Sequence, residues 1–182
     1  MPSLAPALTA DLPLTAQVPA MDEESFRLFY NRTARPLRAY LSASLHDRSL
    51  ADDILQESFL RFLRADLPSG MEDEHRKNYL FRIATNLMRD HYRARKGAAP
   101  LSEALSRAKP AEDLAQRGDM QRIMKELKPR DRELLWLAYV EQFSHREIGS
   151  MIGAKTESIR SMLARARQSL GDLLRAHTGE SK

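Results

Sequence analysis

The stretch that most constrains the fold lies between residues 134 and 174, where two helix starts flank a glycine. Ser144 is followed three residues later by Glu147, the spacing of a capping box in which each side chain accepts from the other residue's backbone amide. Gly153 is suited to end that helix, because glycine readily adopts the left-handed conformation found at helix C-termini. Thr156 is suited to cap the next helix. Two helices joined by so short a turn predict a helix-turn-helix, whose second helix can enter the DNA major groove.

The second helix of this pair has an apolar face and a polar face. Its apolar residues recur at alternating steps of four and three, and they are Ile159, Leu163, Ala166, Leu170 and Leu173. The opposite face carries Glu157, Arg160, Ser161, Ala164, Arg165 and Gln168. Residues 155–175 hold five basic residues against two acidic ones, and arginine can donate two hydrogen bonds to a guanine edge. A solvated surface helix would be polar too, but small side chains near the helix start allow close approach to a groove. We therefore predict a DNA-reading helix.

Composition fits a helical chain of one or two small domains. The chain has 182 residues and a formal net charge of only +4, so nucleic-acid binding has to come from local concentrations of charge. The absence of cysteine excludes disulfides and thiolate zinc sites and suits the cytoplasm. The longest apolar runs are far shorter than the ~20 residues of a membrane span. Seven glycines and nine prolines, with no regular strand alternation, favour an all-α fold.

The predicted helix at residues 50–64 also has two distinct faces. Its apolar face consists of Ala51, Leu55, Phe59 and Phe62. The other face carries Asp53, Gln56, Glu57, Leu60 and Arg64. A leucine exposed among acids and an amide is typical of a surface that binds a protein. Alternatively, the acids complement the helix dipole and Glu57 pairs with Arg61, and this segment alone slightly favours that solvated face.

Basic and aromatic residues alternate in the predicted helix at residues 78–96. Residues 76–96 contain seven basic side chains and one acidic one, with Tyr79, Phe81 and Tyr92 between them. Arg82, Asn86, Arg89 and Arg93 share one face, opposite the apolar Leu80, Ile83, Ala84 and Leu87 with His91 at their end. Cationic groups bind phosphates while rings stack on unpaired bases, so this pattern predicts binding of single-stranded nucleic acid. Core packing accounts for at least one of the three rings.

The remaining segments divide the chain. Prolines at four positions in residues 1–20 favour a disordered tail over a docking segment. Residues 66–77 read as a turn-rich loop. That loop contains a single Glu72-x-x-His75 unit, whereas carboxylate-bridged metal sites need two such units and further glutamates. We therefore expect no metal and no cofactor.

Small residues and two flanking prolines mark residues 97–111 as a linker. This places one domain at residues 21–96 and a second at residues 112–176. The two ends, residues 1–20 and 177–182, are expected to be tails.

Three stretches together resemble the bacterial extracytoplasmic-function sigma factors. They read ADDILQESFLRFLR at 51–64, YLFRIATNLMRDHYRARK at 79–96, and LKPRDRELLWLAYVEQFSHREIGSMIGAKTESIRSMLARARQSL at 127–170. Their order and spacing match the family across roughly residues 22–175. Other helix-turn-helix families share the last motif, but not all three in this order. The resemblance implies two helical domains on a flexible linker, bound to core RNA polymerase and promoter DNA.

The family's functional positions are carried over residue by residue. The resemblance implies contacts with the clamp helices of the β′ subunit from Asp53, Gln56, Glu57 and Leu60, which reverses the preference for a solvated face. It implies contacts with the melted −10 element from Tyr79, Arg82, Asn86, Arg89 and Arg93, together with the 66–77 loop. It implies contacts with the −35 element from Lys155, Thr156, Arg160, Ser161, Ala164 and Arg165. The second domain would also rest on the β flap, and an anti-sigma factor is a further possible partner.

Two departures from the family pattern limit what is carried over. Tyr79 stands where the family often has tryptophan, and tyrosine still supplies an aromatic ring for stacking. Met162 and Ala164 replace residues that are commonly basic, aromatic or histidine. The −35 sequence that this chain recognises therefore cannot be inferred from the family.

Alternative functions remain open from the residues alone. A helix-turn-helix transcription activator would share the reading head, and a regulator that only sequesters polymerase would share the partner surface. A metal-dependent helical enzyme would use Asp52, Asp53 and Glu57, but it would need a second acidic cluster facing them. With no catalytic grouping visible, we predict that the chain is not an enzyme.

Overall fold

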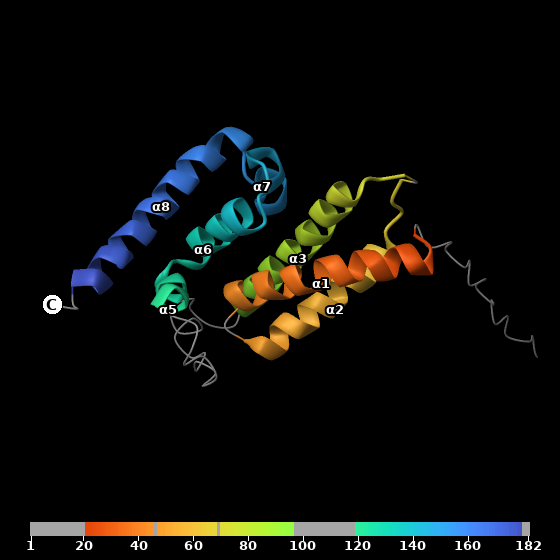
Figure 1. Cartoon of the computed structure of the whole chain (residues 1–182), viewed down its shortest axis with the longest axis horizontal. Helices are drawn as coiled ribbons and strands as arrows, with labels where there is room; N and C mark the ends of the chain where they lie inside the picture. Colours follow the sequence, from red (N-terminus) through yellow and green to blue (C-terminus); the bar gives the residue numbers. More distant parts are fainter. Residues whose placement is uncertain (1–20, 46, 69, 97–118, 180–182) are drawn as a thin grey trace, which may run out of the picture.

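The computed structural model describes residues 21–96 and 119–179, apart from His46 and Ser69. Every regular element in these ranges is helical, as predicted (Figure 1). The elements are α1 (Glu23–Ser44), α2 (Arg48–Arg64), α3 (Asp73–Lys96), α5 (Asp119–Glu126), α6 (Pro129–Leu135), the π-helical turn η1 (Trp136–Val140), α7 (His145–Ile152) and α8 (Thr156–Gly179). The predicted tail at 1–20 and linker at 97–111 lie outside the described residues.

Helix α1 is a single helix that continues through Pro36. Asp22 caps its start by accepting a hydrogen bond from the Ser25 amide at 2.8 Å. Proline lacks the amide that would bond to the preceding turn, yet residues on both sides of it are buried in the same hydrophobic cluster. Phe29 is 1% exposed and Leu37 is 0% exposed. This shared burial offsets the local cost of the missing hydrogen bond, so the segment forms one helix.

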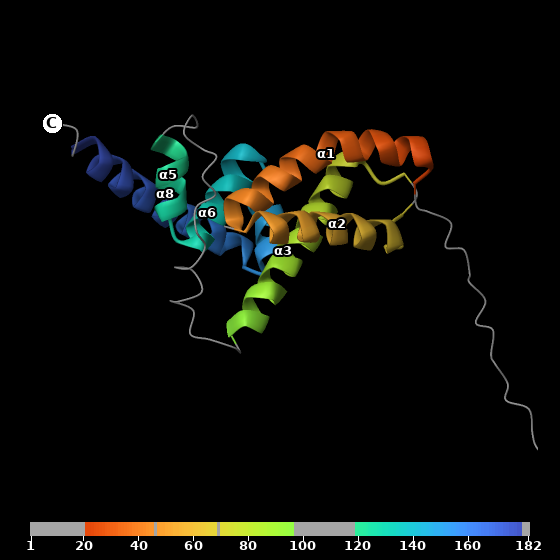
Figure 2. The same ribbon diagram turned by 90° about the horizontal axis from the view of Figure 1, so that it is seen from below.

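Helices α1, α2 and α3 pack together in the first half of the chain. Figure 2 shows α1 and α2 running nearly side by side, with α3 crossing them steeply. Between α1 and α2, the Phe29 and Phe62 rings stack with centroids 4.9 Å apart. Helix α3 begins at Asp73, so the predicted loop at 66–77 is wrong for its last five residues. Asp73 favours a helix start through the dipole, and Arg32 of α1 donates to its carboxylate.

The second half of the chain contains the predicted helix-turn-helix. The capping box of Ser144 and Glu147 is present at the start of α7, and Gly153 ends that helix at φ 65°. Thr156 is the first residue of α8 rather than its cap. The helix then continues to Gly179, so the predicted tail at 177–182 is wrong for three residues. His177 instead bonds to the Glu126 carboxylate at 2.9 Å.

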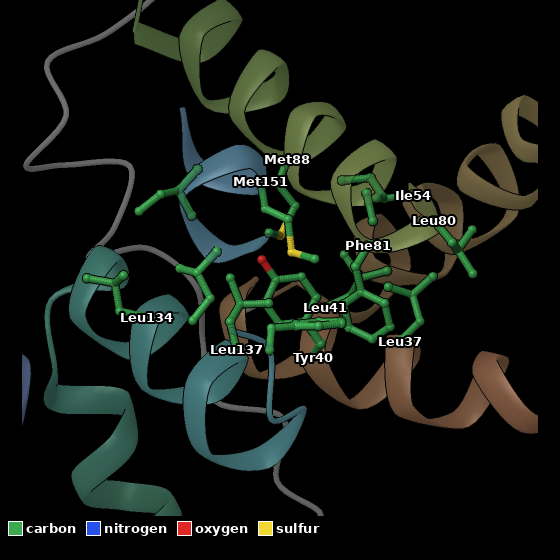
Figure 3. Packing of buried hydrophobic residues seen from close by; sticks show 14 of the residues in the cluster. Leu37, Tyr40, Leu41, Ile54, Leu80, Phe81, Met88, Leu134, Leu137 and Met151 are labelled. Atoms are coloured by element: carbon green, nitrogen blue, oxygen red, sulfur yellow. The ribbon is translucent and has the colours of Figure 1, made fainter. Parts of the chain in front are cut away.

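The two halves share one hydrophobic core (Figure 3). Tyr40 of α1 and Phe81 and Met88 of α3 pack in the same cluster as Leu137 of η1 and Met151 of α7. The Phe81 ring meets the Phe143 ring edge-on, with centroids 5.2 Å apart. The described helices therefore form one packed body, which the sequence reading of two domains on a flexible linker did not anticipate. The reason lies in α3, which has a second apolar face besides its predicted one.

Arg132 ties helix ends from both halves together. Its side chain is only 2% exposed, and it donates to the carbonyls of Met124, Lys125 and Leu127 around the end of α5. It also donates to the carbonyl of Ala43 near the end of α1, at 2.9 Å. Helix C-termini leave carbonyls without intrahelical partners, and one guanidinium satisfies several of them here. Burial lowers the pKa of Arg132.

Candidate DNA and polymerase interfaces

The polar face of α8 is exposed because its opposite face is anchored in the core. Ile159 is 0% exposed and Leu163 3%. All six side chains predicted to meet the −35 element are exposed, namely Lys155, Thr156, Arg160, Ser161, Ala164 and Arg165. A Cβ at Gly149 would lie 2.9 Å from the Ala154 carbonyl oxygen, so α7 and the turn before α8 approach too closely for a larger residue. This close approach fixes the position of the start of α8 relative to α7.

Met162 points into the core rather than toward the polar face. Its side chain is 8% exposed and packs in the main cluster. The departure from the family pattern at this position therefore changes packing beneath α8, whereas the departure at Ala164 is on the exposed surface.

The predicted −10 residues on α3 are divided between solvent and the second half of the chain. Arg82, Asn86 and Arg93 are exposed. Tyr79 is partly buried, with the Arg82 guanidinium 5.0 Å from its ring centroid. Arg89 instead donates to the Met151 carbonyl at 3.2 Å and lies 3.6 Å from the Glu133 carboxylate. Of the residues predicted to bind the −10 element, Arg89 is therefore already paired within the protein.

The three aromatic residues in this basic stretch differ in their surroundings, although Tyr79 and Tyr92 are both partly buried. The Phe81 ring is completely buried in the core. The Tyr92 hydroxyl donates to the Ser44 carbonyl at 3.1 Å, which holds that ring against α1. Tyr79 remains partly accessible beside Arg82. Periodicity did not distinguish the three rings, because Phe81 packs against a segment more than 60 residues away in sequence.

The outer face of α2 combines apolar and charged groups. Asp53 and Gln56 are exposed, and the Leu60 side chain is 46% exposed. Glu57 is partly buried and pairs with Arg61 at 2.7 Å, the pairing expected of a solvated face. An exposed leucine next to an amide and an acid is also what a protein partner could cover. Both features coexist on this helix.

Several buried or hydrogen-bonded carboxyl groups have shifted pKa values. Burial raises the pKa of Glu133, with Arg89 acting in the opposite direction. For Glu147, burial also acts to raise the pKa, but hydrogen bonds from Ser144 and Asn78 outweigh it, so the pKa is lowered. Hydrogen bonding from Arg32 lowers the pKa of Asp73.

Neither a metal-ligand cluster nor a membrane-spanning helix is present among the described residues. Within them, no group of three or more His, Asp or Glu side chains is placed to hold a metal ion. Glu72 and His75 lie 3.8 Å apart on the surface. Among the described helices, none has the length and apolarity needed to cross a membrane.

Comparison with known proteins assigns the two halves. Residues 29–98 match the family model of Sigma-70 region 2, and residues 117–170 match that of Sigma-70, region 4. The ECF RNA polymerase sigma factor SigE of Mycolicibacterium smegmatis is 33% identical over 193 aligned positions, covering 99% of this chain and 72% of the relative. This chain belongs to the ECF sigma factors. The sigma factor is also 28% identical over 156 residues to the ECF RNA polymerase sigma factor SigM of Bacillus subtilis, covering 81% of this chain and 91% of the relative.

Solved protein structures share the fold of this chain. The sigma factor RpoE, in its complex with the anti-sigma factor NepR from Bartonella quintana, superposes with a TM-score of 0.70 and 24% identity, over 84% of this chain and 98% of that one. CnrH, in complex with the cytosolic domain of CnrY, superposes with a TM-score of 0.60, also at 24% identity, over 85% of this chain and 90% of that one.

Family membership gives the sigma factor its general role. It directs promoter-specific transcription initiation by RNA polymerase, with region 2 serving the −10 element and region 4 the −35 element. The matched part of region 2 runs from within α1 to the end of α3, and that of region 4 covers α5 to the middle of α8. Because the chain contains both regions in this order, it is a sigma factor and not the transcription activator considered as an alternative.

Proposed function

We propose that the sigma factor reads the −35 element with Lys155, Thr156, Arg160, Ser161, Ala164 and Arg165 of the helix-turn-helix. The exposure of all six side chains, opposite a buried stripe, is the observation that carries this proposal. A helix held this way can place its N-terminal residues against base edges in the major groove. Arg160 and Arg165 would supply donors that suit guanine, while Lys155 and Thr156 would bind phosphates.

The melted −10 element is proposed to bind Tyr79, Arg82, Asn86, Arg89 and Arg93 of α3. The support is the excess of basic residues along α3 and the Tyr79 ring beside the Arg82 guanidinium. An unpaired base can stack on such a ring while arginine binds the neighbouring phosphate. Residues 66–72, which precede α3, would complete this surface.

Core polymerase is proposed to bind the outer face of α2 through Asp53, Gln56, Glu57 and Leu60, with region 4 on the β flap. The 46% exposure of Leu60 supports this, since it leaves apolar area for a partner to cover. We assign region 2 to residues 21–96, a linker to 97–111 and region 4 to 112–176. The sigma factor is proposed to act in the cytoplasm, without enzymatic activity of its own. The matched structure of RpoE contains an anti-sigma factor, NepR, which supports an anti-sigma factor as a further partner of this chain.

Run-off transcription tests the proposed function as a whole. Core RNA polymerase would be supplied with a template that carries the region upstream of the chain's own coding sequence, with and without the sigma factor. We expect a discrete transcript only when the sigma factor is present. A chain that lowers transcription by another sigma factor, yet gives no transcript itself, would be the sequestering regulator instead.

Substitution of Arg160 tests the −35 assignment. We expect Arg160→Ala to change which −35 sequence is preferred, by about 1–3 kcal/mol if arginine makes a two-pronged contact with a base. Gel-shift titrations of the holoenzyme on promoters with single −35 substitutions would measure it. Arg175→Ala is the matched control, because Arg175 is exposed on the same helix but pairs with Asp172 beyond the proposed surface. Equal preference in the Arg160 variant and the unaltered protein would contradict the assignment.

A further inference from the structure

The exposed polar face of α8 carries an acidic residue, Glu157, which is not among the six residues proposed for the −35 element. Glu157 lies in the first turn of the helix, and its side chain is exposed. At about 100° per residue, Arg160 lies about 60° to one side of Glu157 and Ser161 about 40° to the other. Ile159 and Ala166, both 0% exposed, lie on the opposite side of the helix. Glu157 is therefore at the centre of the face that points away from the core.

The charged side chains of this face have no partners in the protein. Arg175, further along α8, pairs with Asp172. In contrast, no residue that the structure describes bonds to the side chains of Glu157, Arg160 or Arg165. Arg160 follows Glu157 at the spacing of a helical ion pair, yet the two side chains are not joined. The face thus presents one acceptor and several donors that a ligand can bind.

The centre of a helix in the major groove meets base edges, whereas its flanks meet the phosphates on either side. The groove is about 12 Å wide, and an α-helix with its side chains is about 10–12 Å across, so the helix nearly fills the groove. A carboxylate at the centre of the face therefore loses its water. Such a group needs a hydrogen-bond donor from the DNA, because burying an unpaired charge is costly.

Cytosine is the base whose major-groove edge suits a carboxylate. An ionised carboxylate can only accept hydrogen bonds. Cytosine presents its N4 amino group as a donor, with no acceptor beside it. Guanine and thymine present acceptors instead, and adenine presents the acceptor N7 beside its N6 amino group. A carboxylate at this position is therefore attracted by cytosine and repelled by the acceptors of the other three bases.

We infer that Glu157 is a specificity-determining residue that selects cytosine in the −35 element by accepting a hydrogen bond from the N4 amino group. Arg160 then donates to a guanine within about one base-pair step, since three residues span about 4.5 Å of helix and one step spans about 3.4 Å. The −35 element of this chain thus contains a cytosine that is paired with, or adjacent to, that guanine. The inference rests on the proposed −35 role of α8 and adds a base that an acidic residue recognises there.

Glu157 also affects the helix itself, and this effect has to be separated from base recognition. A carboxylate in the first turn stabilises a helix through the helix dipole. That effect is the same for every DNA sequence, and thermal unfolding followed by circular dichroism measures it. The preference between bases at one DNA position therefore reports recognition alone.

Base preference is measured with holoenzyme assembled from core RNA polymerase and the full-length sigma factor. The DNA carries the promoter upstream of the chain's own coding sequence, with each −35 position replaced in turn by all four bases. Competition gel shifts give the relative affinity for each base. For the unaltered protein we expect one position, read on either strand, at which cytosine is preferred by about tenfold, the size of a specific base contact.

Two substitutions of Glu157 should change this preference in different ways. Glu157→Ala should bring the four bases at that position within about twofold of one another. Glu157→Gln should replace the preference for cytosine by one for adenine, because an amide can bond to both N6 and N7 of adenine. Asp172→Asn is the matched control, since it removes the same charge from an exposed position of α8 beyond the proposed surface. It should leave every base preference unchanged.

The possible failures can be told apart. A cytosine preference that persists in Glu157→Ala would overturn the inference and leave the −35 assignment intact. The same holds if Glu157→Gln lowers the affinity equally for all four bases, which is the result expected of a residue that only stabilises the helix start. If the unaltered holoenzyme shows no preference at any −35 position, the −35 role of α8 is wrong and the inference fails with it.

Discussion

Replacing both Gln56 and Leu60 by alanine should weaken binding of core RNA polymerase by about 100-fold, or roughly 3 kcal/mol. The reason is that Leu60 is 46% exposed in the free protein, so a partner can bury it as an apolar anchor, with Gln56 one turn earlier on the same helix face. Neither side chain is in the core, so helicity measured by circular dichroism should not change. Titration of labelled sigma factor with core polymerase would measure the loss.

Leu28→Ala is the matched control for this experiment. Leu28 is 55% exposed, but it lies on α1 outside the proposed α2 surface, so its loss should leave the affinity nearly unchanged. If the Gln56 and Leu60 double variant bound as tightly as the unaltered protein, the polymerase surface would have to be elsewhere. If Leu28→Ala lowered the affinity as much as the double variant does, exposed leucines in general, rather than this face of α2, would contribute to binding.

Arg132→Met should lower the free energy of unfolding by about 3–5 kcal/mol, because several buried carbonyls lose their donor and each unsatisfied polar group costs about 1–3 kcal/mol. The substitution keeps much of the side-chain volume but leaves the Ala43, Lys125 and Leu127 carbonyls without this donor. For a protein of this size the loss corresponds to a fall in Tm of about 10 °C. Urea and thermal unfolding followed by circular dichroism would measure both quantities.

Two further variants separate the causes of that loss. Arg132→Lys retains the charge but not the planar fork of donors, so it should recover only part of the stability. Arg130→Met removes an exposed arginine two residues away and should change the free energy of unfolding by less than about 0.5 kcal/mol. An Arg132→Met variant as stable as the Arg130→Met variant would show that the observed hydrogen bonds contribute little.

Local sequence signals were sufficient for the helix-turn-helix and for the exposed polar face of its second helix. The capping box and the left-handed glycine involve residues within one helical turn of each other, so their chemistry is visible in the sequence itself. The same holds for α8, where spacing of apolar residues separated the buried Ile159 and Leu163 from the exposed Arg160. The order of three motifs then pointed to the family that the comparisons confirmed.

The tertiary structure alone decided which face of α3 is free. Apolar periodicity identifies side chains that avoid water, but it does not name the surface that covers them, and Phe81 was as compatible with base stacking as with the core. The pairing of Arg89 with Glu133 joins residues 44 positions apart, and that of Lys77 with Glu141 joins residues 64 apart. No local propensity specifies such pairs, because they exist only once the two halves have packed. That packing converts one predicted DNA contact into an internal ion pair.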